Sequence, residues 1–240
     1  MMAGMASATR TDTVTVPDGE FDLHVWVPEA GSGPGLLLLQ EIFGVGAYLR
    51  HVAERLVGRG YVVAAPDVFW RLQRNWEADH DEAGLTESLA LVSRFDFPTG
   101  ISDCVAAFRR LQELSEVRGG CGVIGFCLGG LLTYHVAVQA DPTAAVSYYG
   151  SNIAAGLDLV EHIACPIQFH FGEHDPYIPL EQVDQIMAAM SGRPDAEVHV
   201  QPGAGHAFDN LEAPMFHHPA AAEAAWALTT GFLAKHLPVD

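Results

Sequence analysis

The sequence predicts an α/β fold: a mostly parallel central sheet flanked by helices on both faces, with an N-terminal antiparallel hairpin. Strand-like runs alternate with helical ones along most of the 240 residues, which is typical of parallel sheets wound by right-handed crossovers. Residues 35–40 and 61–65 are almost entirely apolar, as expected for parallel strands covered on both faces. We therefore expect one domain over residues 12–240, after a flexible tail at residues 1–11.

The N-terminal half opens with the predicted hairpin, whose strands, residues 14–16 and 21–27, are joined by an Asp-Gly turn. A helix follows the first parallel strand, and glycines beyond it indicate its end. The polar segment at residues 67–96 has little strand character and predicts a lid-like loop and helix over the site. The helices expected in this half span residues 47–56 and 101–114.

The C-terminal half repeats the alternation of strand and helix to the end of the chain. Its short apolar runs have the length of buried strands, and its longer segments have helical spacing. We expect strands at residues 121–124, 145–149, 166–171 and from 197, and helices at 131–140, 180–190 and 220–236.

Charge and cysteine usage narrow the function classes. A formal net charge of −18 repels phosphate backbones and anionic membrane surfaces, so we expect neither nucleic-acid nor membrane binding. No run has transmembrane length, and residues 1–11 lack the layout of a signal peptide. The four cysteines form no CxxC pair. Together these features predict a cytoplasmic protein with reduced thiols.

One short motif carries most of the functional information. Gly125-Phe126-Cys127-Leu128-Gly129-Gly130 lies between a predicted strand and a predicted helix. In that context, Gly-x-nucleophile-x-Gly is the nucleophile elbow of α/β-hydrolases, here with cysteine as the attacking residue. The alternative interpretation is a glycine-rich turn that contains an ordinary buried thiol.

Two later residues have the positions that such a nucleophile requires of its partners. Hydrolases of this fold carry nucleophile, acid and histidine in that chain order. Asp175 follows one predicted strand and His206 follows the next. Taken separately, Asp175 could cap the following helix and His206 could be an ordinary loop histidine. The order of all three residues favours a catalytic triad.

The predicted chemistry is nucleophilic catalysis by a thiolate. His206 would take the proton of Cys127 and later protonate the leaving group, while Asp175 orients the imidazole. The dipole of the helix that begins near Leu128 favours the thiolate. The backbone N–H groups of Leu128 and Ile42 are the expected oxyanion donors.

Further motifs extend this pattern along most of the chain. The sequence from about residue 12 to 236 resembles the dienelactone hydrolases, also called carboxymethylenebutenolidases. The resemblance implies a cysteine-dependent hydrolase that cleaves a small-molecule carboxylic ester or enol-lactone through an acyl-cysteine and needs no cofactor. The motifs that carry it are Gln40-Glu41-Ile42-Phe43-Gly44-Val45, Ala65-Pro66-Asp67, the cysteine elbow, Tyr148-Tyr149-Gly150, Gly172 with Asp175, and Gly205-His206-Ala207-Phe208.

Glu41 has two interpretations. From the sequence alone, a carboxylate beside the oxyanion loop can be a capping or ion-paired residue. In dienelactone hydrolases, the matching glutamate holds the resting cysteine as a thiol and releases it as thiolate when substrate binds. The resemblance therefore implies that Glu41 modulates the nucleophile.

The chain departs from the family where substrate carboxylates bind. Family members that cleave dienelactone hold the carboxylate with two arginines, which align here with Leu85 and Asn210. Neither side chain can provide the bidentate clamp of arginine. We therefore expect a less anionic substrate. The residues expected to contact substrate are Phe43, Arg71, Phe208 and Asn210, with surface solvation as the alternative for Arg71.

Two other functions stay open at this point. A non-enzymatic ligand-binding or regulatory module on the same fold is compatible with the missing arginines. A metal-dependent hydrolase is suggested by the 12 histidines, since His170, His174 and His206 could cluster with Asp175. No helical His pair with an intervening acid occurs, so we expect no metal site. The oligomeric state is not predicted.

Overall fold

A computed structural model describes residues 10–239 of the chain. Its contacts divide into two compact units, one reaching to Cys121 with the C-terminal end added, and the other spanning Gly122–Pro238. Each unit is described by itself. Of the tail predicted at residues 1–11, residues 1–9 lie outside the described part, and Arg10 and Thr11 belong to the first strand.

The first unit contains the predicted hairpin and the first parallel strand pair. Strands β1 (Arg10–Val16) and β2 (Gly19–Trp26) pair antiparallel, and β2 also pairs antiparallel with β4 (Val62–Pro66). β4 pairs in parallel with β3 (Gly33–Leu39), in the order β1-β2-β4-β3. Every residue of β3 and β4 is buried, which confirms the interpretation of the two apolar runs.

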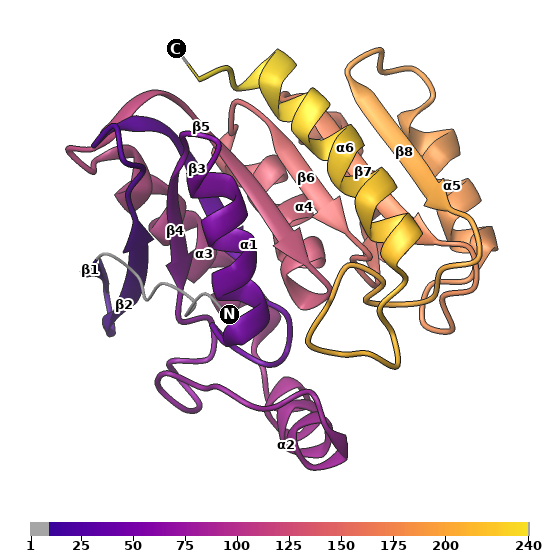
Figure 1. Cartoon of the computed structure of the whole chain (residues 1–240), viewed down its shortest axis with the longest axis horizontal. Coiled ribbons are helices and arrows are strands. Elements are labelled where there is room, and N and C mark those ends of the chain that lie inside the picture. The colour runs from indigo at the N-terminus through magenta and orange to yellow at the C-terminus, as the bar shows by residue number, and fades with distance from the viewer. Residues whose placement is uncertain (1–9, 240) are drawn as a thin grey trace, which may run out of the picture. The chain divides into compact units, whose positions relative to one another are not determined.

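Helices cover both faces of this half-sheet. Figure 1 shows α1 (Ala47–Val57) on one side of β4 and α3 (Phe97–Gln112) on the other. The segment predicted to leave the sheet at residues 67–96 does so, and it contains α2 (Glu82–Val92). α3 begins earlier than predicted, because Pro98 fits the first helical turn and the Thr99 hydroxyl donates to Asp96 at 2.7 Å.

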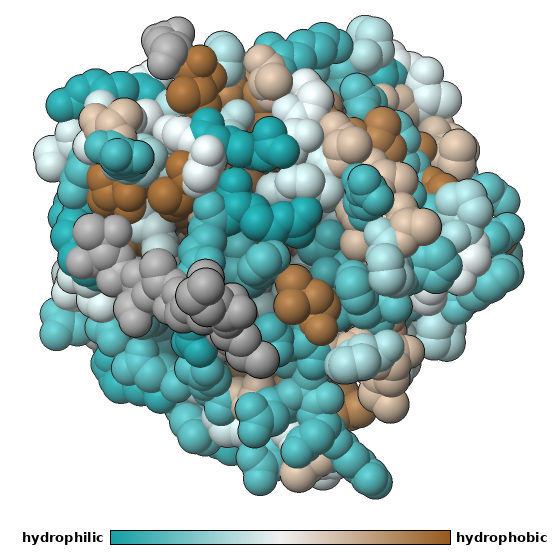
Figure 2. Space-filling model, viewed as in Figure 1, coloured by the Kyte–Doolittle hydropathy of each residue, from teal (hydrophilic) through white to brown (hydrophobic). Residues whose placement is uncertain are grey.

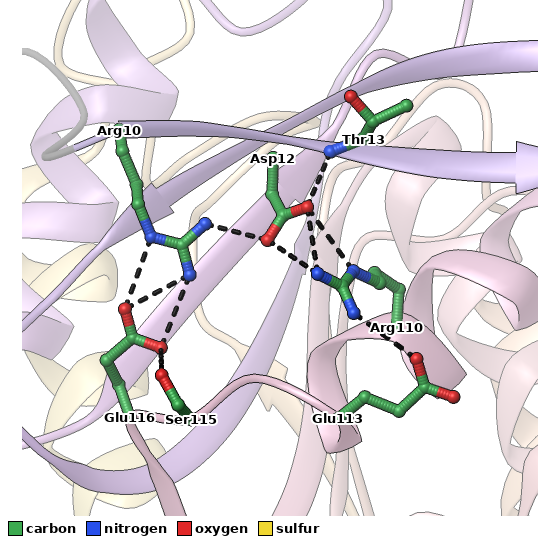
Figure 3. Close-up of polar contacts among 7 residues, drawn as sticks. All are labelled: Arg10, Asp12, Thr13, Arg110, Glu113, Ser115 and Glu116. Atoms are coloured by element: carbon green, nitrogen blue, oxygen red, sulfur yellow. Dashed lines mark hydrogen bonds and ion pairs between the residues drawn. The ribbon is translucent and has the colours of Figure 1, made fainter.

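An ion-pair network fastens the edge strand β1 to α3 (Figure 3). Asp12 accepts hydrogen bonds from Arg10 at 2.7 Å and from Arg110 of α3 at 3.0 Å. Arg10 also contacts Glu116, just before the next strand. Burial raises the pKa of Asp12, but these donors outweigh it and hold that pKa below its ordinary value.

The second unit contains a half-sheet that is entirely parallel. β5 (Val117–Phe126) starts in the first unit and enters the second, where the order is β5-β6-β7-β8. The other strands are β6 (Ala145–Tyr148), β7 (Ile167–Gly172) and β8 (Ala196–Gln201). Figure 1 shows α6 (Pro219–His236) on one face, and α4 (Leu128–Ala140) with α5 (Leu180–Met190) on the other. These elements confirm the predicted alternation.

One helix in this unit was not predicted. η1 (Ile153–His162) is a 3-10 helix in which Gly156 has non-helical backbone angles, φ −121° and ψ 26°. Ile153 is its one buried residue and Gly156 interrupts it, so the segment resembles a connection between strands more than a core helix.

A buried polar cluster connects β7, β8 and α6. The His170 side chain has no exposed surface, and its Nε2 lies 2.9 Å from Gln168 Oε1 and 3.0 Å from Thr229 Oγ1. Gln201 Nε2 lies 3.3 Å from His170 Nδ1. Burial, together with the stacked ring of His199, holds the pKa of His170 well below its ordinary value. His170 is therefore a neutral member of the core.

The surface fits the composition. Figure 2 shows a face dominated by hydrophilic residues, with apolar residues in small scattered groups, as on an ordinary protein surface. Across residues 10–239, no helix combines the length and apolar character that crossing a bilayer requires.

Candidate active site

The turn between β5 and α4 is built as the sequence motif predicts. Cys127 lies between β5 and α4 with φ 54° and ψ −114°, a backbone conformation that residues other than glycine rarely adopt. The neighbouring glycines are required by space. A Cβ on Gly125 would lie 2.1 Å from the Gly129 carbonyl oxygen, and one on Gly130 would lie 2.5 Å from that of Tyr148. The strained turn thus projects the cysteine from the end of the strand.

Cys127 also occupies the N-terminal end of a helix. Its carbonyl oxygen accepts the N–H groups of Gly130 at 2.9 Å and Leu131 at 3.2 Å, which starts the hydrogen bonding of α4. The N–H groups of Leu128 and Gly129 therefore lie in the first helical turn, where a helix offers no intrahelical acceptor. Such N–H groups and the helix dipole favour negative charge beside Cys127.

Asp175 and His206 meet Cys127 at the carboxyl ends of the parallel strands. Cys127 Sγ lies 3.2 Å from His206 Nε2, and His206 Nδ1 lies 2.7 Å from Asp175 Oδ2. Asp175 follows β7 and His206 follows β8, so the parallel half-sheet brings three distant residues together. The structure thus joins the three residues that the sequence nominated.

Asp175 has a second role in its own loop. Its Oδ1 accepts the backbone N–H groups of Tyr177 at 2.8 Å and Ile178 at 3.2 Å, while Oδ2 faces His206. The carboxylate thus organises the turn before α5 and also orients the imidazole. The alternative that Asp175 caps the following helix is wrong, because the N-cap of α5 is Pro179 and no side chain caps that helix.

The electrostatics of His206 follow from its two neighbours. Burial lowers the pKa of His206, but the Cys127 sulfur and the Asp175 carboxylate outweigh burial and hold that pKa well above its ordinary value. An imidazole with this bias readily accepts the proton of a thiol 3.2 Å away.

Two tyrosines contact the His206 ring from different environments. Tyr149 is fully buried and lies edge-on at 5.2 Å between ring centroids. Tyr177 lies at 5.1 Å, also edge-on, and is 60% exposed. Sequence reasoning missed Tyr177, although its place two residues after the acid was the available signal. It is the aromatic ring beside His206 that a ligand in solvent can reach.

The other three cysteines differ from Cys127. Cys104, Cys121 and Cys165 are buried, whereas Cys127 is partly exposed. Burial raises the pKa of Cys121 to about 11 and that of Cys165 to about 12, and it also raises that of Cys104. Thiols with such high pKa values are poor nucleophiles at neutral pH.

The loop at residues 41–46 carries the other residues nominated for the reaction. Glu41 is 3% exposed, and its Oε2 lies 3.5 Å from His80 Nε2. Glu41 therefore has a histidine within ion-pairing distance in the first unit. Phe43 packs against the same histidine, with 4.1 Å between ring centroids. The Ile42 carbonyl oxygen accepts the indole N–H of Trp76 at 3.1 Å.

The remaining residues nominated for substrate contact have structural roles. Arg71 donates to Asp103 of α3 at 2.8 Å and to Asp18 of the hairpin turn at 2.9 Å, so its guanidinium joins these two elements. Phe208 is fully buried behind Tyr149. Asn210 is 1% exposed and its Oδ1 accepts the N–H of Glu212. These contacts and this burial argue against substrate binding by Arg71, Phe208 and Asn210.

The histidines do not gather around a metal position. Among residues 10–239, no group of three His, Cys, Asp or Glu side chains is placed to hold a metal ion. His170 lies in the buried cluster, and His218 caps α6 by accepting the N–H of Ala221 at 3.2 Å.

Comparison with known proteins gives a consistent result. Residues 21–237 match the model of the dienelactone hydrolase family. A carboxymethylenebutenolidase of a Pseudomonas species is 32% identical over 92% of this chain and 92% of its own length. Carboxymethylenebutenolidase 1 of Cupriavidus pinatubonensis is 34% identical over 84% of this chain and 86% of its own length.

Solved structures show the same fold. The crystal structure of a putative dienelactone hydrolase from Klebsiella pneumoniae has a TM-score of 0.78 at 23% identity, with 94% of this chain and 97% of that chain covered. An acylaminoacyl peptidase has a TM-score of 0.74 at 13% identity, with 95% of this chain and 41% of that chain covered. The predicted α/β-hydrolase fold is confirmed.

Proposed function

The chain belongs to the dienelactone hydrolase family of ester and lactone hydrolases, and from this premise we propose that it cleaves its substrate with Cys127 as the nucleophile. The observation that carries the proposal is the unbroken line of contacts from sulfur to imidazole to carboxylate, at 3.2 Å and 2.7 Å. Family membership favours a hydrolase over the non-enzymatic module that the sequence alone left open.

The reaction begins with transfer of the Cys127 thiol proton to His206 Nε2. The sulfur then attacks the carbonyl carbon, the carbonyl π pair moves to oxygen, and a tetrahedral intermediate forms. Its collapse breaks the C–O bond to the leaving group, which takes the proton from His206 and leaves an acyl-cysteine. Asp175 keeps the imidazole in the productive tautomer throughout.

Hydrolysis of the acyl-cysteine repeats the proton transfers with water. His206 removes a proton from the attacking water, the second tetrahedral intermediate expels the sulfur, and the carboxylic acid is released. We assign the backbone N–H of Leu128 as one donor to both oxyanions because it follows the nucleophile, and that of Ile42 as the other by family resemblance. The helix dipole of α4 adds to this stabilisation.

Two more residues complete the proposal. Glu41 restrains the resting thiol, as the matching glutamate does in dienelactone hydrolases, and its burial at 3% exposure suits a carboxylate with a specific partner. Phe43 packs against His80, the histidine that lies near Glu41, and is proposed to contact substrate. Because Leu85 and Asn210 replace the clamping arginines and Arg71 is tied to two aspartates, we propose a neutral ester or lactone as the preferred substrate.

The test compares hydrolysis of cis-dienelactone and of a neutral aryl ester by wild type, Cys127→Ala and Cys127→Ser. We expect faster turnover of the neutral ester and no activity in Cys127→Ala. Mass spectrometry after an acid quench should find the acyl group on Cys127. Activity that survives Cys127→Ala, or an acyl group on another residue, would refute the cysteine mechanism.

A further inference from the structure

Glu41 is a buried carboxylate that meets a histidine from a distant part of the sequence. Glu41 is 3% exposed, and burying a carboxylate is unfavourable unless a polar partner compensates it. His80 brings its Nε2 to 3.5 Å from Glu41 Oε2, and the His80 side chain is itself 8% exposed. His80 comes from the segment at residues 67–96, outside the predicted triad and oxyanion loop.

His80 ends a short segment, residues 76–80, which we call the clasp. The clasp runs along the loop at residues 41–46 and forms several hydrogen bonds with it. Trp76 Nε1 donates to the Ile42 carbonyl oxygen at 3.1 Å, and the Ala78 N–H donates to the Phe43 carbonyl oxygen at 3.2 Å. Gly44 and Glu77 form an antiparallel bridge. The clasp is therefore the second strand of a small pairing that fixes this loop.

Two further features show how closely the clasp and the loop fit. Gly44 has φ +81°, and a Cβ there would lie 1.7 Å from the Trp76 carbonyl oxygen, so a residue without a side chain is required. Arg50 of α1 grips both Glu77 carboxylate oxygens, at 2.6 Å and 3.0 Å. It also donates to the Val45 carbonyl oxygen at 2.8 Å. The clasp is thus held both by the loop that it pairs with and by Arg50 of α1.

We propose that His80 is a positioning residue, which fixes the orientation of the Glu41 carboxylate and thereby supports the modulation of Cys127 proposed for Glu41. Phe43 keeps the His80 imidazole in place by ring packing at 4.1 Å, and the clasp keeps the His80 backbone beside the loop. His80 acts through Glu41, and it has no contact with the reacting atoms in this proposal. The inference rests on the proposed function, since it presumes that Glu41 modulates the nucleophile.

The two contacts of His80 can be removed separately. His80→Phe retains an aromatic ring to pack on Phe43 but offers Glu41 no polar group. His80→Gln loses the ring and retains an amide donor near the position of Nε2. Each substitution is made in wild type and in Glu41→Gln, and His162→Gln serves as the control because His162 pairs with Glu161 at 3.8 Å on the surface.

Three quantities are measured for each variant: kcat and KM for the neutral ester, the rate of Cys127 alkylation by iodoacetamide without substrate, and the thermal midpoint. We expect His80→Phe to lower kcat/KM roughly tenfold to hundredfold, because the buried carboxylate of Glu41 loses a polar partner. It should shift alkylation in the same direction as Glu41→Gln. His80→Gln should stay near wild type, and His80→Phe should have no further effect in the Glu41→Gln background.

Two results would overturn the proposal. One is an equal effect of His80→Phe with and without Glu41, which would mean that His80 acts independently of the carboxylate. The other is an active His80→Phe together with an impaired His80→Gln. That result would mean that His80 contributes only by packing its ring against Phe43. If His80→Phe does not fold, His80→Asn, whose amide is too short to reach Glu41, replaces it. Activity that persists in Cys127→Ala would instead overturn the proposed function.

Discussion

The neutral, buried His170 should make the protein sensitive to mild acid, and the size of the effect follows from its surroundings. Its Nδ1 faces the Gln201 amide nitrogen and its Nε2 faces the Gln168 amide oxygen, an arrangement that suits a neutral ring with its proton on Nε2. A second proton would place two donors against each other at Nδ1, in addition to the cost of burying the charge.

The sign of the effect follows from linkage. The pKa of His170 lies well below its ordinary value in the folded protein and near 6.5 in the unfolded chain. Below about pH 6.5, the unfolded chain binds a proton that the folded protein does not, so the free energy of unfolding falls with pH. Between about pH 7.5 and about pH 5, this one group lowers it by about 2 kcal/mol.

Urea unfolding of wild type and His170→Gln across this range isolates the contribution. Ionisable groups other than His199, whose ring stacks on His170, affect both proteins alike, so the difference in unfolding free energy between them is the quantity to follow. As pH falls to about 5, we expect the unfolding free energy of wild type to fall by about 2 kcal/mol relative to that of the variant. A difference that stays constant with pH would refute the reasoning, because it would mean that folded His170 accepts a proton.

Three further predictions concern the site. Asp175→Asn should lower kcat roughly a thousandfold to ten-thousandfold with little change in KM, because the amide favours the wrong imidazole tautomer; steady-state kinetics with the neutral ester checks this. Gly130→Ala should destabilise the fold by about 3 kcal/mol in urea unfolding, because its Cβ would lie 2.5 Å from the Tyr148 carbonyl oxygen. Tyr177→Ala should raise KM for aryl esters more than for alkyl esters, because its exposed ring beside His206 is available for stacking; an equal change for both would contradict this role.

The fold and the contacts among Cys127, His206 and Asp175 could be predicted because clear sequence signals mark them. The buried strands β3 and β4 are continuous apolar runs, and the glycines around Cys127 form a recognisable motif between a strand and a helix. Asp175 and His206 each follow a recognisable strand, and parallel strands bring their carboxyl ends to one edge. Chain order then sufficed to join the three residues.

The surroundings of the site could not be predicted because they depend on tertiary partners. Arg71 looks free in the sequence, yet the hairpin turn and α3 bring Asp18 and Asp103 to it. His80 lies in a polar segment without a motif, and only pairing of the clasp with the loop sets it against Glu41. No periodicity in the sequence encodes either contact.

At Cys127, the residue that would relieve backbone strain differs from the one that provides the sulfur. A residue other than glycine held at φ 54° and ψ −114° costs about 1 to 3 kcal/mol, which glycine would not incur. Cys127→Gly is therefore expected to melt at a higher temperature than wild type while lacking the sulfur. Under the proposed mechanism, a screen that selects for thermal stability alone would enrich an inactive variant, so any engineering of this protein needs a catalytic selection alongside the thermal one.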